Sequence, residues 1–325
     1  MPHTDTLELS PAAVSAWADS VGVDVEQVEA LPGDVSPRLY FRLRSRSGES
    51  SIVACYPESL RSACERFGET TRLLEKAGVP VPSVLARDPD HRFMLLEDVG
   101  SCSLYDLAGR TWQELEPYLH QAAELAGRIA GLDVPAVAGL SPPLDRALLE
   151  RELEQTWREF LAPRSLVSEP QLAGRLERAL AALCAQLAAQ PPWPCHRDFM
   201  ARNLALKDGS LVVLDHQDLR LGPPCYDLAS LLNDSLFPPE ELAFRVLDRA
   251  GVKESERPGY HRVAAQRTLK AVGTFARFAE RGSPRHLPLI PPTLTRALGH
   301  LARLPESQEL CAELSQAWAT YLLLH

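Results

Sequence analysis

The chain has 325 residues, 45% of them hydrophobic, and a formal net charge of −9. This length can bury a large core, which favours two lobes. The negative charge and the absence of a basic stripe exclude a nucleic-acid partner. No apolar run reaches the roughly 18 residues of a membrane span, and residues 1–5 lack the features of a signal peptide. Seven cysteines without a Cys-x-x-Cys pair indicate reduced thiols, so we predict a cytoplasmic protein with no membrane partner.

The first hundred residues carry a strand pattern followed by a helix pattern. Residues 39–46 alternate apolar and basic side chains, and residues 51–56 can pair with them through a turn at 47–49. Residues 58–77 have apolar side chains at helical spacing, and Gly78 can end that helix. We therefore expect a small antiparallel sheet with a helix against it.

A second apolar strand is predicted at residues 93–97, directly before Asp98-Val99-Gly100. A strand that runs into a hinge is a place where adenine can hydrogen-bond to backbone groups, here those of Glu97 and Val99. The alternative is a plain linker between two lobes, and both descriptions can hold together.

The rest of the chain is predicted to be largely helical. Residues 112–190 have a helical pattern interrupted at prolines, and Pro191-Pro192-Trp193-Pro194 ends the last of these helices. Further helices are expected at 227–233, 240–250 and 255–281, with two more near the C-terminus.

Three residues have the spacing that phosphoryl transfer requires. Asp198 and Asn203 lie on one short loop, and Asp215 follows an apolar run that is typical of a buried strand. A carboxylate can orient an acceptor hydroxyl, while carboxylate and amide oxygens suit Mg²⁺. We assign Asp198 to the acceptor hydroxyl as the catalytic base, and Asn203 and Asp215 to magnesium. The alternative is a loop whose polar side chains only form local turns.

Neighbouring residues receive supporting roles. His196 is expected to brace the backbone of the loop, and Arg202 could hold a substrate anion. Gln217 and Asp218 could face the hydroxyls of an acceptor sugar. Asp227 is expected to be a helix N-cap that also fixes the loop.

Other polar residues near the motif are interpreted more simply. His216 is expected to pack in the core. Three basic residues recur near helical spacing downstream, namely Arg267, Lys270 and Arg277. A solvated helix face is the default interpretation for them, and the alternative, implied by the family resemblance described next, is that one binds a lactyl carboxylate or an acetamido group.

These motifs carry a resemblance to a known family. Residues 196–203 with Leu214-Asp215 resemble the catalytic core of aminoglycoside phosphotransferase-like kinases. The run from Asp215 to Leu231 is similar to bacterial anomeric kinases that phosphorylate N-acetylmuramate and N-acetylglucosamine at C1 for peptidoglycan recycling. Residues 33–43 and 266–277 resemble that family's phosphate loop and C-terminal helix. The resemblance covers roughly residues 30 to 305.

The resemblance implies an α+β, bilobal, protein-kinase-like fold. Residues 1–98 would form a small antiparallel-sheet N-lobe, 99–102 a hinge, and 103–325 a large helical C-lobe. It also implies ATP and Mg²⁺ as cofactors and an amino sugar as acceptor. The sugar 1-phosphate product would suit a nucleotidyltransferase as the next enzyme.

The N-terminal part departs from the family pattern. A glycine-rich phosphate loop is absent, and none of the four lysines lies in residues 51–56, where the kinase lysine would stand. Ser36 and Arg38 are therefore assigned to the nucleotide phosphates. Residues 101–325 hold 24 Lys/Arg against 27 Asp/Glu, and this near balance favours a neutral or anionic acceptor. The alternatives are a kinase for an aminoglycoside, choline or homoserine-like acceptor, and a non-catalytic nucleotide-binding regulatory protein.

Overall fold

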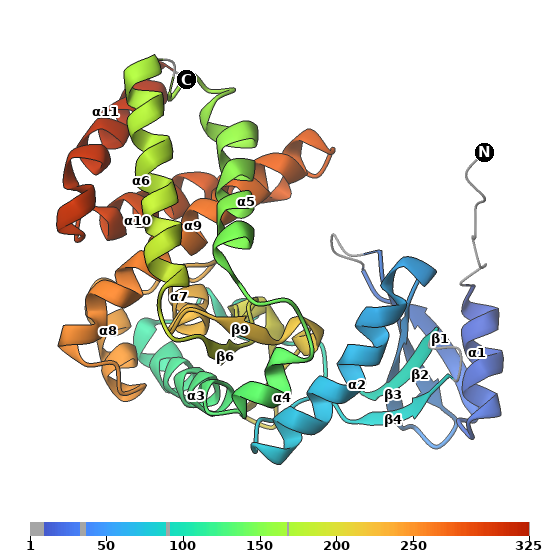
Figure 1. The fold of residues 1–325 in the computed structure, drawn as a ribbon. Coiled ribbons are helices and arrows are strands. Elements are labelled where there is room, and N and C mark those ends of the chain that lie inside the picture. The colour runs from blue at the N-terminus through green and yellow to red at the C-terminus, as the bar shows by residue number, and fades with distance from the viewer. Residues whose placement is uncertain (1–9, 33–36, 89–91, 168, 325) are drawn as a thin grey trace. The chain divides into compact units, whose positions relative to one another are not determined.

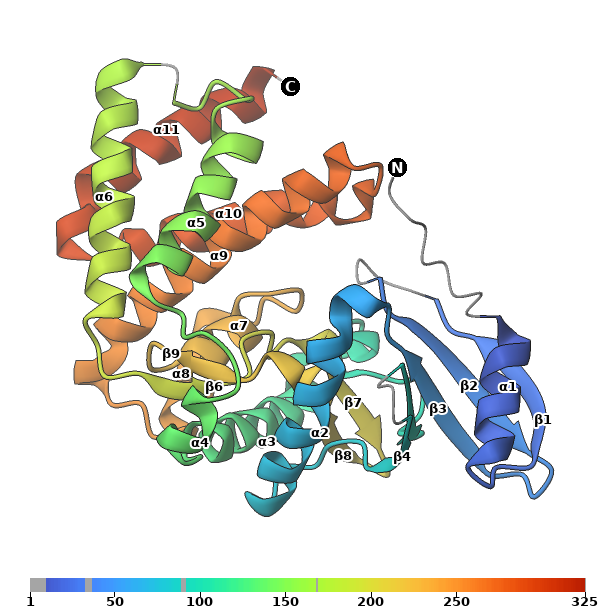
Figure 2. The same ribbon diagram turned by 45° about the vertical axis from the view of Figure 1, so that its right-hand side comes forward.

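The computed structural model describes residues 10–32, 37–88, 92–167 and 169–324, so Ser36 lies outside the described residues. The chain divides into two compact units, and we describe each by itself (Figures 1 and 2). Unit 1 comprises residues 1–102 and 205–218, and unit 2 comprises 103–204 and 219–325. The segment 205–218 therefore returns to the N-terminal unit after an excursion of about one hundred residues.

Unit 1 contains a five-stranded antiparallel sheet of order β1-β2-β3-β5-β4. The strands and the two helices beside them are α1 (Pro11–Ser20), β1 (Val25–Ala30), β2 (Leu39–Ser45), β3 (Ser50–Cys55), α2 (Arg61–Lys76), β4 (Val84–Arg87) and β5 (Phe93–Glu97). The β2–β3 hairpin, the helix ended by Gly78 and the strand before the hinge confirm the predictions. The sequence interpretation missed α1, β1 and β4.

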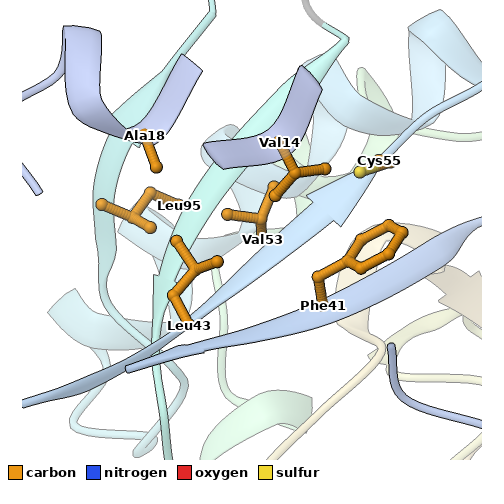
Figure 3. Close-up of a cluster of buried hydrophobic side chains, with 7 residues drawn as sticks. All are labelled: Val14, Ala18, Phe41, Leu43, Val53, Cys55 and Leu95. Carbon is orange, nitrogen blue, oxygen red and sulfur yellow. The ribbon is translucent and has the colours of Figure 1, made fainter. Parts of the chain in front are cut away.

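Both faces of this sheet are covered. Successive strand residues point to opposite faces, and α1 packs on the face formed by Phe41, Leu43, Val53 and Leu95 (Figure 3). The other face packs against α2 through a second apolar cluster. Because β3 is central in the sheet and both faces are covered at Val53, Ala54 and Cys55, its second half can be apolar on both faces.

A hairpin from the returning segment completes unit 1. It consists of β7 (Leu204–Lys207) and β8 (Ser210–Val213), followed by a 3₁₀ turn at His216–Asp218. The Val213 N–H donates to the Pro80 carbonyl over 2.8 Å. Val99 packs with Ala205 and Val212 in a small apolar cluster. These contacts fix the strand that leads to Asp215.

Unit 2 is predominantly helical. Its α-helices are α3 (Trp112–Ala130), α4 (Val134–Ala138), α5 (Arg146–Thr156), α6 (Pro170–Ala188), α7 (Tyr226–Leu232), α8 (Glu240–Arg249), α9 (Arg257–Glu280), α10 (Ile290–Leu301) and α11 (Gln308–Leu324). A short two-stranded ribbon joins β6 (Trp193–Cys195) to β9 (Arg220–Gly222). Within the described ranges, none of the helices combines the length and apolarity that crossing a bilayer would demand.

The long helix α9 lies unusually close to α5. A Cβ atom added at Gly273 would meet the Thr156 Cα at 2.6 Å and its nitrogen at 2.8 Å, so only glycine fits. The Thr156 hydroxyl donates to the Leu269 carbonyl over 2.8 Å at the same crossing. Because the two helices approach so closely at Gly273 and Thr156, polar side chains one helical turn from this crossing can also come into contact.

Candidate active site

The loop that carries Asp198 is fastened at its start by Asp227. The backbone N–H groups of His196 and Arg197 donate to the Asp227 carboxylate over 2.7 and 3.0 Å. Arg197 has a φ of +78°, a conformation that costs a non-glycine residue about 1 kcal/mol or more. The N-cap of α7 is Cys225, so the predicted N-cap role of Asp227 is wrong, since this residue lies inside the first turn.

Asp198 and Asn203 are joined within the loop. The Asn203 side-chain nitrogen donates to the Asp198 carbonyl over 2.8 Å. This bond turns the amide oxygen away from the loop backbone, where it has no hydrogen-bond partner among the described residues. Arg202, one residue before, lies over the Tyr105 ring at 3.6 Å. His196 is fully buried and packs edge-on against Phe199.

Three cations surround Asp198. The Arg267 guanidinium lies 3.8 Å from its carboxylate, and Arg267 also donates to the Ser230 hydroxyl over 3.0 Å. Glu152 of α5 binds Lys270 at 3.3 Å and Arg197 at 3.4 Å. The expectation that Arg267 and Lys270 line a solvated helix face is wrong, because both side chains are nearly buried. The close α5–α9 crossing brings Glu152 within reach of them.

These charges set the protonation of Asp198. Burial opposes ionisation, but Lys270, Arg197 and Arg267 outweigh it and hold the Asp198 pKa well below its usual range. The Glu152 pKa is also lowered, since the attraction of Lys270 and Arg197 exceeds the effect of burial. Asp198 is therefore a fixed carboxylate at neutral pH, able to accept a hydrogen bond from a hydroxyl but weak as a base.

The supporting carboxylate behaves differently. Burial raises the pKa of Asp227 to about 6, although His196 and the two backbone N–H groups favour its ionised form. When Asp227 is protonated, one of its two oxygens carries a hydrogen and is a poorer acceptor for the backbone N–H groups of the loop. The attachment of His196 and Arg197 to α7 is thus expected to loosen below about pH 6.

Asp215 belongs to unit 1 and follows β8. Its φ of +59° places it in the left-handed region, a strain that functional sites often retain. Its Oδ1 atom accepts from the Arg38 guanidinium over 2.6 Å and from the Gln217 amide nitrogen over 2.9 Å. Arg38, Asp215 and Gln217 are therefore brought together, whereas Asp218 is half-exposed and forms the end of the same turn.

The turn after Asp215 is held against α2. His216 is fully buried, packs on the Phe67 ring in a tilted arrangement and shares a 2.7 Å hydrogen bond with the Thr70 hydroxyl, in agreement with the predicted packing role. The Arg66 side chain donates to the Gln217 carbonyl over 3.3 Å. Asp215 therefore stands on a rigid support.

The predicted adenine contacts lie at the end of β5. The Glu97 N–H donates to the Ser83 carbonyl over 2.9 Å, and the Glu97 carboxylate forms an ion pair with Lys207. Val99 is buried. Asp98, between them, accepts two bonds from Arg42 at 2.7 and 3.1 Å, which neutralises the carboxylate that follows β5.

The donor set suits magnesium better than a metal that prefers many protein ligands. Among the residues that the structure describes, no three His, Cys, Asp or Glu side chains gather into a metal cluster. Mg²⁺ commonly takes only one or two carboxylates and completes its shell with water and phosphate. Next to Asp215, the Gln217 amide oxygen is buried and has no hydrogen-bond partner among the described residues, so an oxygen acceptor is left for a cation or donor.

Site residues that lie in the same unit can be compared with the predictions. Roles that require residues of both units together remain predictions. Asn203 belongs to unit 2 and Asp215 to unit 1, so their sharing of one magnesium ion is not tested. The sequence interpretation missed Glu152 entirely. A carboxylate among the polar residues of α5 gives no signal of its own, and its partners Gln266 and Lys270 lie more than one hundred residues away on α9.

Comparisons with known proteins place the chain in a family. The model of the Phosphotransferase enzyme family (APH) matches residues 27–265. The chain therefore belongs to this family, and it is a small-molecule kinase that uses a nucleoside triphosphate.

Individual relatives are similar over most of their length. An N-acetylmuramate/N-acetylglucosamine kinase of Pseudomonas aeruginosa is 32% identical over 88% of both chains. Its counterpart in Pseudomonas putida is 30% identical over 92% of this chain and 91% of the relative. The ADP-bound aminoglycoside phosphotransferase APH(2'')-Ib has the same fold, with a TM-score of 0.62 and 16% identity over 93% of this chain and 99% of that one. The predicted protein-kinase-like fold is confirmed.

Proposed function

We propose that the protein transfers the γ-phosphoryl group of ATP to the anomeric hydroxyl of N-acetylmuramate, N-acetylglucosamine or both. The observation that carries this proposal is the similarity to N-acetylmuramate/N-acetylglucosamine kinases over about nine tenths of the chain. We also propose a role in amino-sugar and peptidoglycan recycling, which the same similarity supports.

The surroundings of Asp198 agree with such an acceptor. A carboxylate whose pKa is held low by three cations is a poor base for an ordinary alcohol. An anomeric hydroxyl is more acidic than an ordinary alcohol, so Asp198 needs only to orient it and to take its proton late in the transfer. Arg202 remains the proposed contact for an acceptor anion, and Gln217 and Asp218 for the sugar hydroxyls.

The nucleotide and its metal would be bound by residues of both units. Asn203 and Asp215 are proposed to hold Mg²⁺, which would neutralise the phosphate oxygens when it is bound. Backbone groups at Glu97 and Val99 are proposed to contact adenine. Arg38 is proposed to contact the phosphates, together with Ser36.

An acceptor panel tests the proposal. The purified protein is incubated with MgATP and N-acetylmuramate, N-acetylglucosamine, an aminoglycoside, choline or homoserine, and ADP release is measured. ³¹P and ¹³C NMR then locate the phosphate on the product. We expect turnover only with the N-acetylated sugars and an acid-labile 1-phosphate. A 6-phosphate, or turnover restricted to choline or an aminoglycoside, would contradict the proposal.

A further inference from the structure

The Arg38–Asp215 ion pair joins two residues proposed to bind different parts of one ligand. Arg38 stands immediately before β2, and Asp215 lies 177 residues later in the same unit. Arg38 is buried, with 8% of its surface exposed, so its guanidinium needs an anion nearby. The Asp215 carboxylate supplies that anion at 2.6 Å.

The bonds to Asp215 leave little room for a second cation on the same atom. A carboxylate oxygen offers two lone pairs, and Oδ1 already accepts from Arg38 and Gln217. The Asp215 side chain is 35% exposed, so Oδ2 remains accessible. A divalent cation on this carboxylate would stand a few ångströms from the Arg38 guanidinium, and the two positive charges would repel each other.

Arg38 also has the properties that the absent strand lysine would have. It is always charged, it is nearly buried, and its fork of N–H groups can bind phosphate oxygens in pairs. Its guanidinium lies 5.8 Å from the Tyr40 ring, which gives the cation a second support beside the carboxylate. The neighbouring Gln217 amide oxygen is buried and has no hydrogen-bond partner among the described residues. It is therefore an acceptor for a hydrogen-bond donor that replaces the guanidinium beside Asp215.

We propose that Arg38 and magnesium exchange on Asp215. Without nucleotide, Arg38 neutralises the carboxylate; when the metal–nucleotide complex binds, the guanidinium leaves Asp215 and pairs with the phosphates. The same arginine thus protects a metal-binding carboxylate and then does the work of the missing lysine. This inference rests on the proposed use of ATP and Mg²⁺.

The exchange predicts two opposite effects of one substitution. Arg38→Met should raise the affinity of the nucleotide-free protein for Mn²⁺, used as a probe for magnesium, because a competing cation is removed. The same change should lower the affinity for a non-hydrolysable ATP analogue at saturating Mg²⁺. We expect about a fivefold gain in the first and roughly a tenfold loss in the second.

The experiment uses the full-length protein and two binding readouts. Mn²⁺ binding is followed by water proton relaxation, and nucleotide binding by calorimetry. Arg44→Met is the matched control, because Arg44 is an exposed arginine of β2, the strand that follows Arg38, and it should change neither affinity. Arg38→Lys should retain the competition with Mn²⁺, and Arg38→Met combined with Asp215→Asn should lose the gain. If Arg38→Met does not fold, Arg38→Gln provides the same comparison.

The outcomes separate the alternatives. A loss of both affinities would show a permanent structural pair, and an unchanged Mn²⁺ affinity with weaker nucleotide binding would show a phosphate contact without exchange; either result overturns the proposal. Failure of the acceptor panel with both opposite effects present would reject the sugar-kinase function and leave the exchange standing. If the protein phosphorylates the sugars but Arg38→Met changes neither the Mn²⁺ affinity nor the nucleotide affinity, the exchange is rejected and the sugar-kinase function stands.

Discussion

Asp215 and Asp198 are two aspartates of one motif with very different surroundings. Among the residues that the structure describes, Asp215 has one cationic partner, Arg38, and one amide donor, and its side chain is partly exposed. Asp198 lies among three cations that are themselves held by Glu152 and Ser230. A single ion pair can be exchanged for a ligand, whereas a network of mutually bonded charges resists rearrangement. The surroundings of Asp215 therefore allow its carboxylate to change partners, whereas those of Asp198 keep its carboxylate in one fixed set of contacts.

The largest effect is expected at the fixed carboxylate. Asp198→Asn keeps the shape but removes the charge that orients the acceptor hydroxyl, so kcat should fall roughly 100- to 10,000-fold. Nucleotide affinity, measured by calorimetry, should stay within about twofold of wild type. Asp208→Asn, in the exposed β7–β8 turn, is the control and should be fully active. Full activity of the Asp198 variant would refute its assignment as the base.

The charged network around Asp198 is held in place by the close crossing of α5 and α9. Gly273→Ala should disturb this crossing. The new methyl group would meet Thr156 backbone atoms below 3 Å, so the helices must separate. We expect a loss of about 1–3 kcal/mol in the free energy of unfolding by urea. Gly127→Ala in α3 has nothing within 4 Å and should be neutral or slightly stabilising. Equal stability of the two variants would mean that the crossing can relax.

Lys270 tests whether charge, rather than packing, keeps Asp198 ionised. Lys270→Met removes the largest attractive charge acting on Asp198 and leaves Glu152 with one partner fewer. We expect kcat to fall about tenfold with the KM for ATP little changed, since one favourable charge pair is lost. Lys270→Arg should recover most of the rate, and Lys76→Met, exposed on α2, should have no effect. A rise in KM alone would place Lys270 outside the support of Asp198.

A neutral network elsewhere in unit 2 gives an effect of a different kind, on stability as a function of pH. His261 and His300 share a 2.9 Å contact between their Nδ1 atoms, and His300 Nε2 meets Asn233 Oδ1 at 2.8 Å. Because Asn233 Oδ1 can only accept, His300 donates there and His261 donates to His300. Burial, aided for His300 by His261 and for both by nearby arginines, lowers the pKa of His300 to about 3 and of His261 to about 4.

This network makes folding stability pH-dependent. The folded-state pKa values lie below the unfolded value of about 6.5, so the unfolded chain takes up protons first as the pH falls. The contribution is complete above about pH 6.5 and is lost progressively towards pH 3. Between pH 7 and 5, urea unfolding should show a loss of about 2 kcal/mol that depends on His300. His300→Gln should have a shallower pH dependence; an unchanged one would assign the loss to other groups.

The sequence predicted what depends on local spacing. Asp198, Asn203 and Asp215 follow a short-range pattern, and the β2–β3 hairpin follows from alternation and a turn. It did not predict β1, because an edge strand with the exposure pattern of Val25–Ala30 has little apolar signal. Nor did it predict α1, a ten-residue helix in which only Val14 and Ala18 are fully buried among its described residues.

Charge pairs between residues far apart in the sequence were the other feature that could not be predicted. Arg267 and Lys270 on a helix are compatible with a solvated face as well as with a buried network, and only the position of Glu152 decides between them. That position depends on Gly273, which the sequence alone presents as one glycine within a helix. Arg38 was assigned to the nucleotide phosphates, and its pairing with a residue 177 positions away could not be derived from the pattern.

The return of residues 205–218 to unit 1 has a consequence for biosynthesis. When residues 1–102 leave the ribosome, the hairpin that packs on Val99 and bonds to Pro80 has not yet been made. Asp215, the partner of the buried Arg38 cation, is still absent at that time. The N-terminal sheet therefore lacks this hairpin and the Asp215 carboxylate until about one hundred further residues have been made, and a nascent chain arrested before residue 205 is expected to be more sensitive to proteases than the same residues in the finished protein.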